Sequence, residues 1–140
     1  MIAFDTDVLS EILKGNQDLV RRANLVPRHE QAVPIVAVEE ILRGRLNGIR
    51  QAEANKANLS VDQAYYLFER SLIHLGRLRF LPYTPEAEMV YQQWRGQKVR
   101  VGTQDLRIAA ICVAQACTLI SRNRRDFERI PGLLVEFWDQ

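Results

Sequence analysis

Short apolar runs alternate with segments of helical periodicity along the whole chain, and this alternation restricts the possible folds more than any other feature. Five runs predict short strands, at residues 2–5, 32–38, 80–83, 118–121 and 133–138. Because helical segments separate the runs, the strands are expected to lie parallel, with helices covering both faces of the sheet. We therefore expect an α/β fold, a three-layer α/β/α domain with a central, mostly parallel five-stranded sheet.

Length and composition predict a single domain spanning residues 1–140. A chain of 140 residues with 47% hydrophobic composition can bury a core without disulfides. The 19 Lys and Arg residues against 17 Asp and Glu residues give a formal charge of +2, which excludes a polycation. No apolar run approaches the ~20 residues that cross a membrane. Acidic residues occupy the place of a secretory signal, so we expect a cytoplasmic protein.

Local signals predict where several helices begin and end. Thr6 offers a cap for a first helix, and a later helix is expected from about Glu39 to near Gly48. Ser60 or Asp62 is expected to cap a longer helix. Large apolar residues recur along this longer helix at helical spacing and predict its buried side: Tyr65, Leu67, Phe68, Leu72 and Leu75.

Three carboxylates fall where parallel strands lead into helices. Asp5 ends the first strand, Glu40 lies in the first turn of the helix after the second, and Asp105 opens the helix before the fourth. Binding and active sites of parallel α/β proteins lie at this edge of the sheet. Carboxylates gathered there repel one another unless a cation neutralises them, and Mg²⁺ or Mn²⁺ prefers such ligands. Taken singly, each carboxylate is also explained as a helix cap.

Motifs at both ends of the chain resemble those of a known family. The first strand leads into DTDVL from Asp5, and the second run leads into EILRG from Glu40. The sequence DLRIAA starts at Asp105, SRNRRDF follows from Ser121, and GLLVEFW closes the chain from Gly132. In this order the motifs resemble the PIN domain, in particular the VapC ribonuclease toxins of bacterial toxin–antitoxin pairs. Between these motifs, only general helical character matches.

The resemblance implies a set of catalytic residues around Mg²⁺, with Mn²⁺ as a substitute. Asp5, Glu40 and Asp105 are the implied metal ligands, and Glu40 would bind the metal or orient the attacking water. Asn123 falls at the family's fourth polar position, where relatives often carry Asp. Asp126 either supplies that missing charge or has a local role as a cap or as the partner of an arginine.

Other polar residues are expected to support these ligands. Thr6 and Ser121 are expected to hydrogen-bond within the site, and Asp7 to lie just behind the ligands. The adjacent Glu39 and Glu40 are about 100° apart on a helix, so only one can face the cluster. The resemblance favours Glu40, because a glycine follows it at the family's spacing.

Arginines bunch around the proposed carboxylates. A basic rim around an acidic centre suits a nucleic-acid backbone, and a solvated charged face is the alternative. The arginines expected to bind RNA are Arg43, Arg100, Arg107, Arg122, Arg124 and Arg125.

The function expected from these features is a Mg²⁺-dependent endoribonuclease that uses a metal-activated water. The resemblance implies a toxin silenced by a cognate antitoxin, and a homodimer or larger assembly. Residues 8–26 and 60–76 offer apolar faces for such partners, although core packing also explains them. One alternative is a PIN-like RNA-binding module that has lost catalysis. Another is a haloacid-dehalogenase-type phosphatase, since Asp5 and Asp7 form a D-x-D pattern, but no late acidic pair follows.

Overall fold

The computed structural model describes all of residues 1–140 and contains one five-stranded sheet. Its strands are β1 (Ile2–Phe4), β2 (Gln31–Pro34), β3 (Phe80–Leu81), β4 (Thr118–Ser121) and β5 (Val135–Phe137). The order across the sheet is β3-β2-β1-β4-β5, and each neighbouring pair is parallel. The sheet is therefore wholly parallel, in line with the prediction of a mostly parallel one.

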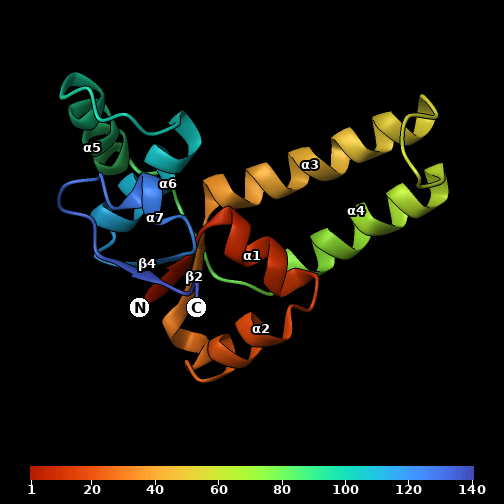
Figure 1. Cartoon of the computed structure of the whole chain (residues 1–140), viewed down its shortest axis with the longest axis horizontal. Helices are drawn as coiled ribbons and strands as arrows, with labels where there is room; N and C mark the ends of the chain where they lie inside the picture. Colours follow the sequence, from red (N-terminus) through yellow and green to blue (C-terminus); the bar gives the residue numbers. More distant parts are fainter.

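Helices connect the strands and cover both faces of the sheet (Figure 1). They are α1 (Thr6–Leu13), α2 (Gln17–Asn24), α3 (Ile35–Glu53), α4 (Val61–Leu75), α5 (Pro85–Gly96), α6 (Thr103–Ala114) and α7 (Arg124–Phe127). Consecutive residues of the central strands, such as Leu119 and Ile120, are fully buried. Because successive side chains of a strand point to opposite faces, both faces must be covered, which confirms the α/β/α arrangement. No helix has both the length and the apolar character needed to cross a membrane.

The α3 and α4 helices form a hairpin that extends away from the sheet (Figure 1). Near its tip, Ile49 and Ala52 of α3 pack with Ala64 of α4 in a small core of their own. Because α4 packs mainly on α3, much of its predicted apolar side is open, and Tyr65 and Leu72 are exposed. The periodicity of this segment predicted the helix but overestimated how much of it is buried.

The second strand is shorter than predicted, and the helix after it is longer. Residues 32–38 were expected to be a strand, but β2 ends at Pro34 and the rest of the run begins α3. In a short buried apolar run, periodicity does not distinguish a strand from a buried helix, which explains the error. The helix also continues through Gly48 to Glu53, because its last turns pack against α4.

Side chains at two helix starts fix where those helices begin. Asp5, rather than the expected Thr6, caps α1, since its Oδ1 accepts a hydrogen bond from the Val8 backbone N–H at 2.8 Å. Ser60 caps α4 in a capping box with Gln63, as one of the two predicted candidates. The first cap matters for function because it holds the Asp5 carboxylate in place.

Candidate active site

The strand order places a crevice between β1 and β4. From β1 the chain moves to β2 and β3 on one side, whereas β4 and β5 lie on the other. Ligands of parallel α/β proteins bind at the carboxyl ends of the strands at such a switch point. Asp5 follows β1 and Ser121 ends β4, so both lie at this point.

The Asp5 carboxylate is buried and held on both oxygens. Oδ1 accepts from the Val8 N–H, and Oδ2 accepts from the Ser121 hydroxyl at 2.6 Å. Burial raises the pKa of Asp5 to about 6, although both hydrogen bonds act to lower it. Each carboxylate oxygen keeps a further lone pair, so Asp5 is fixed in position and can still bind a cation.

Glu40 is the glutamate that joins the site. Its Oε1 accepts a hydrogen bond of 2.5 Å from the Thr6 hydroxyl, which connects the start of α1 to α3. The neighbouring Glu39 is exposed and instead contacts Arg43 and Gln104. The structure therefore places Glu40 as expected and leaves its second oxygen without a hydrogen bond.

Asp105 lies in the first turn of α6 and is half-buried. Its carboxylate makes no hydrogen bond, in contrast to that of Asp5. Burial raises the pKa of Asp105 to about 6, and the charges of Glu40, Asp5 and Asp126 add to the effect. The charges of three carboxylates from separate elements thus act on Asp105, and no basic side chain contributes to its pKa.

Asn123 and Asp126 form a closed pair at the start of α7. The Asn123 Oδ1 accepts from the Asp126 N–H at 3.2 Å, and its Nδ2 donates to Asp126 Oδ2 at 2.9 Å. Asn123 is therefore the cap, and it also receives support from Ser121, whose Oγ accepts the Asn123 N–H. Asp126 makes no ion pair with an arginine, and its charge contributes to the raised pKa of Asp105.

Two arginines of the predicted rim are tied to carboxylates. Arg122 donates to Asp7 Oδ2 at 2.9 Å, which brings Asp7 to the edge of the site. Its positive charge lowers the pKa of Asp5, whereas the charge of Asp7 raises it. Arg124 pairs with Asp139 near the end of the chain. These pairs reduce the positive charge that the two arginines present to a ligand.

The other predicted arginines differ in whether they already have a partner within the chain. Arg107 lies over the ring of Tyr91, 4.9 Å from the ring centre, and its Nε is buried without a partner. It thus belongs to the packing of α5 against α6. Arg43 is exposed and pairs with Glu39. Arg100 and Arg125 are exposed and make no ion pair, so they remain available to bind a polyanion.

The donor set of the site suits a divalent cation. Asp5, Glu40 and Asp105 supply hard oxygen ligands, and Asp105 has no other partner. The side chains as they stand do not bring three such groups into metal-binding distance of one point. Like charges oppose a closer approach, and a cation would remove that opposition. The residues therefore fit Mg²⁺ or Mn²⁺ by chemistry, with side-chain adjustment on binding.

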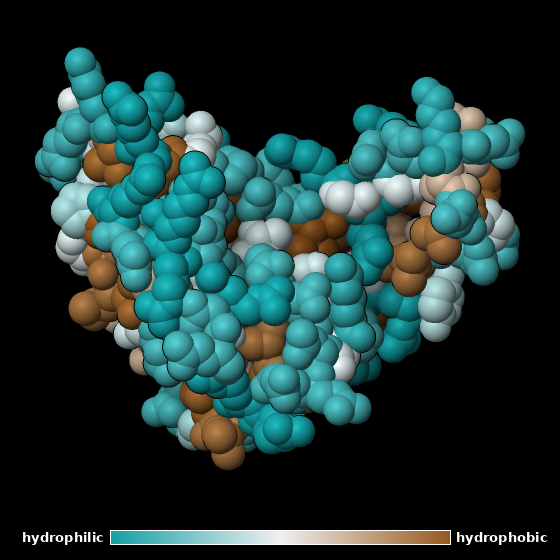
Figure 2. All heavy atoms as spheres, viewed as in Figure 1, coloured by the Kyte–Doolittle hydropathy of each residue, from teal (hydrophilic) through white to brown (hydrophobic).

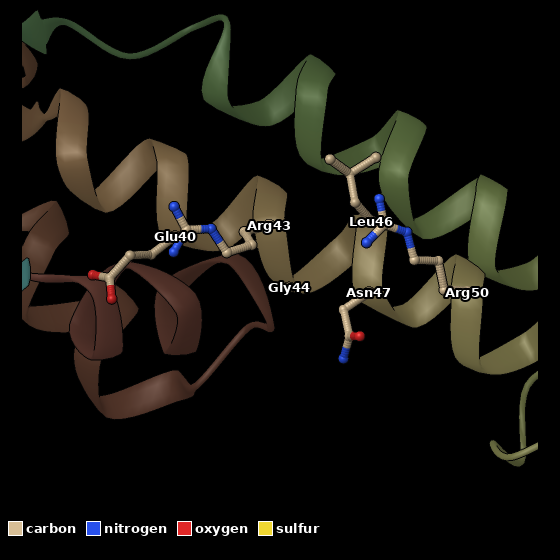
Figure 3. A pocket seen from close by; sticks show the side chains of 6 residues that line it. All are labelled: Glu40, Arg43, Gly44, Leu46, Asn47 and Arg50. Carbon is tan, nitrogen blue, oxygen red and sulfur yellow. The ribbon is translucent and has the colours of Figure 1, made fainter.

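A groove of about 550 Å³ runs along α3 from this site (Figure 3). Its lining residues are Glu40, Arg43, Gly44, Leu46, Asn47 and Arg50. Asn47 and Arg50 were not among the residues expected from the sequence. Their spacing from Glu40 and Arg43 at three- and four-residue steps places them on one helix face, and this pattern could have revealed them.

The fold is that of a parallel α/β domain with a carboxylate cluster at its switch point, and the PIN-domain family profile matches residues 2–133. The chain therefore belongs to the PIN-domain family. Among its relatives, the tRNA(fMet)-specific endonuclease VapC of Salmonella typhimurium is 24% identical over 138 residues, covering 96% of this chain and 95% of that protein. Ribonuclease VapC2 of Rickettsia felis is 32% identical over 72 residues, covering 49% of this chain and 54% of that protein.

Solved structures confirm the fold. The DNA-bound VapBC structure from Salmonella typhimurium matches with a TM-score of 0.76 at 23% identity, over 98% of this chain and 97% of that one. VapBC2 from Rickettsia felis, bound to a promoter DNA fragment, matches with a TM-score of 0.74 at 21% identity, over 99% and 100%. The resemblance to PIN domains and VapC ribonucleases is therefore confirmed, and it replaces the haloacid-dehalogenase alternative.

Proposed function

We propose that the chain is a metal-dependent endoribonuclease that hydrolyses RNA phosphodiester bonds in the cytoplasm as the toxin of a toxin–antitoxin pair. The observation that carries this proposal is the half-buried carboxylate of Asp105, which makes no hydrogen bond and whose pKa is raised first by burial and then by the charges of Glu40, Asp5 and Asp126. Unneutralised carboxylates at a switch point are typical of a cation site. The relatives named as ribonucleases support RNA as the substrate class.

Different residues of the chain would have different roles in this reaction. Bound Mg²⁺ or Mn²⁺ would lower the pKa of a water molecule and neutralise charge on the phosphoryl oxygens. Asp5, locked by Val8 and Ser121, would hold the ion at a fixed position. Asp105 would bind the same ion through its free oxygens. The catalytic role of Asn123 is indirect, since it fixes the orientation of Asp126.

Glu40 is the group best placed to handle a proton. Thr6 occupies its Oε1, so Oε2 remains free to bind the ion or to accept a proton from the attacking water. The exposed Arg100 and Arg125 would hold the flanking phosphates in position. Positioning by fixed hydrogen bonds supplies much of the rate enhancement in such reactions.

The proposed protein partners are a cognate antitoxin and a second copy of the chain. Support comes from the neighbouring structures, which are VapBC toxin–antitoxin complexes. A further support is the open side of α4, where Tyr65, Tyr66 and Leu72 line a hollow of about 440 Å³. Aromatic residues such as the exposed Tyr65 and Tyr66 are enriched at protein interfaces.

A cleavage assay tests the proposal. A mixed RNA substrate should be cleaved in Mg²⁺ or Mn²⁺ but not in EDTA, and Asp105→Asn should abolish cleavage. Asp18→Asn on α2 is the matched control, because it removes an exposed carboxylate far from the site. Cleavage that persists in EDTA or in Asp105→Asn contradicts the proposal. RNA binding without any cleavage by the parent protein would favour the alternative, a catalytically silent RNA-binding module.

A further inference from the structure

The groove along α3 is continuous with the proposed active site. Glu40 lines this groove and also a second hollow of about 280 Å³, which lies against α1 and includes Thr6 and Lys14. Gly44 is shared by both hollows. In the surface view, a depression separates the α5 side of the molecule from the tip of the α3–α4 hairpin (Figure 2). The concave surface therefore leads from the carboxylates outward along α3.

The charges of this groove change with distance from the site. Glu40 is the one carboxylate in its lining, and it lies at the end next to the site. Beyond it come Arg43, Asn47 and Arg50; the side chains of Arg43 and Arg50 extend toward the Glu40 end, and Asn47 points away from the helix (Figure 3). Arg50 makes no ion pair and no side-chain hydrogen bond, whereas Arg122 and Arg124 of the predicted rim are both paired. Within the groove Arg43 is paired with Glu39, so Arg50 supplies its unpaired positive charge, in addition to the unpaired Arg100 and Arg125 elsewhere on the surface.

Gly44 keeps the groove open at its middle. A Cβ atom at this position would meet no other atom within 4 Å, so packing does not require glycine there. Glycine inside an exposed helix is unfavourable relative to other residues. A side chain at position 44 would project into both hollows that this residue lines. The absence of a side chain therefore favours a ligand that lies directly on the helix.

We propose that this groove binds the single-stranded part of the RNA that flanks the cleaved phosphodiester, with Arg43 and Arg50 contacting its phosphates and Asn47 a sugar or base between them. The proposal rests on the nuclease function above and extends it to a path for the substrate. At 1.5 Å per residue, Glu40 and Arg50 are about 15 Å apart along the helix. An extended strand of a few nucleotides matches this length, and its repeated negative charge matches the lining.

Binding measurements with Arg50→Gln test this path. The probe is a fluorescein-labelled single-stranded RNA about a dozen nucleotides long, in EDTA so that it stays intact, and the readout is anisotropy over a salt series. Arg50→Gln should weaken binding roughly threefold to fivefold. It should also reduce the salt slope by about 0.7, the value for one phosphate contact on a single strand. The matched control is Arg21→Gln, an exposed arginine of α2 on another side of the molecule, which should change neither quantity.

A second variant distinguishes loss of RNA contacts from loss of the folded structure. Gly44→Leu fills the floor of the groove and favours helix, so it should weaken RNA binding while the melting temperature is unchanged or raised. The proposal is overturned if both variants bind RNA like the Arg21→Gln control. It is also overturned if they lose binding of an acidic polypeptide, tested with poly-glutamate, while RNA binding is unaffected. If both variants lose RNA binding but the parent protein never cleaves RNA, the result supports the proposed groove and contradicts only the nuclease function.

Discussion

The Ser121 hydroxyl donates a 2.6 Å hydrogen bond to Asp5 Oδ2, and it joins the ends of β1 and β4 across 116 residues of sequence. The same oxygen of Ser121 accepts the Asn123 N–H, so one side chain ties the first carboxylate of the site to the start of α7. Both Asp5 and Ser121 are buried. This contact sets the geometry of the crevice and favours the ionised form of Asp5.

Ser121→Ala is expected to raise the pKa of Asp5 further, because burial then acts without the compensating hydrogen bond. Above about pH 6, where Asp5 is ionised, the free energy of unfolding should fall by about 1.5–3 kcal/mol. At about pH 5 the loss should be smaller, since protonated Asp5 depends less on this donor. Chemical denaturation at the two pH values measures the difference.

The control for this variant is Ser71→Ala. Ser71 is a buried serine of α4 that accepts a hydrogen bond from Arg45, and no carboxylate with a shifted pKa depends on it. Its effect on stability should be the same at both pH values. A pH-independent loss in Ser121→Ala as well would show that Ser121 does not control the ionisation of Asp5.

Removal of the Asp105 charge is expected to stabilise the metal-free protein. Asp5 and Asp105 have pKa values of about 6 in the folded chain against 3.8 for a free group, so the folded state binds more protons between these values. Stability should therefore fall as pH rises from about 4 to about 6, by at most about 3 kcal/mol for the buried Asp5. Asp105 is partly exposed, and Asp105→Asn should gain on the order of 1 kcal/mol at about pH 8.

Urea denaturation in EDTA at about pH 5 and about pH 8 measures this dependence. Asp18→Asn removes an exposed carboxylate that pairs with Arg21, and it should not stabilise the protein. If Asp105→Asn keeps the full pH dependence of the parent and gains nothing at high pH, the carboxylates do not repel one another as described.

The arginines of the predicted rim are expected to contribute unequally to RNA binding. Arg125 is exposed without an ionic partner, whereas Arg124 pairs with Asp139 and Glu128. Arg125→Gln should therefore weaken RNA binding and reduce its salt slope by about 0.7. Arg124→Gln should have a smaller effect, because its positive charge is already neutralised within the chain. Equal salt slopes for the two variants would contradict this ranking.

The sequence predicted the existence and order of the strands because these depend on local pattern, and the same pattern indicated which carboxylates follow the strands. The run before Asp5 and the run before Ser121 each read as a strand, and parallel topology then places their ends together. The choice of Glu40 over Glu39 also agrees with the structure, which shows Glu40 bonded to Thr6. The largest strand error lies at the boundary between β2 and α3, where burial hides the helical period. The runs expected at residues 80–83 and 133–138 also form shorter strands, Phe80–Leu81 and Val135–Phe137.

Features that depend on pairing between distant residues could not be predicted. The ion pair of Arg122 with Asp7 joins positions 115 residues apart, and it changes how much charge the rim presents. The stacking of Arg107 on Tyr91 likewise follows from how α5 packs on α6. The groove at Arg50 depends on α3 continuing past Gly48, which the contacts with α4 decide. Such properties require the tertiary structure.

Calorimetric titration with Mn²⁺ tests the central claim most directly, because it measures the cation site without relying on cleavage. The adjacent glutamates provide a matched pair, since Glu40 faces the carboxylates and Glu39 faces solvent. Asp105→Asn and Glu40→Gln should each weaken Mn²⁺ binding by about tenfold or more, and Glu39→Gln should leave it unchanged. Equal affinity for Mn²⁺ in the parent, Asp105→Asn and Glu40→Gln would contradict the assignment of this carboxylate cluster as a metal site.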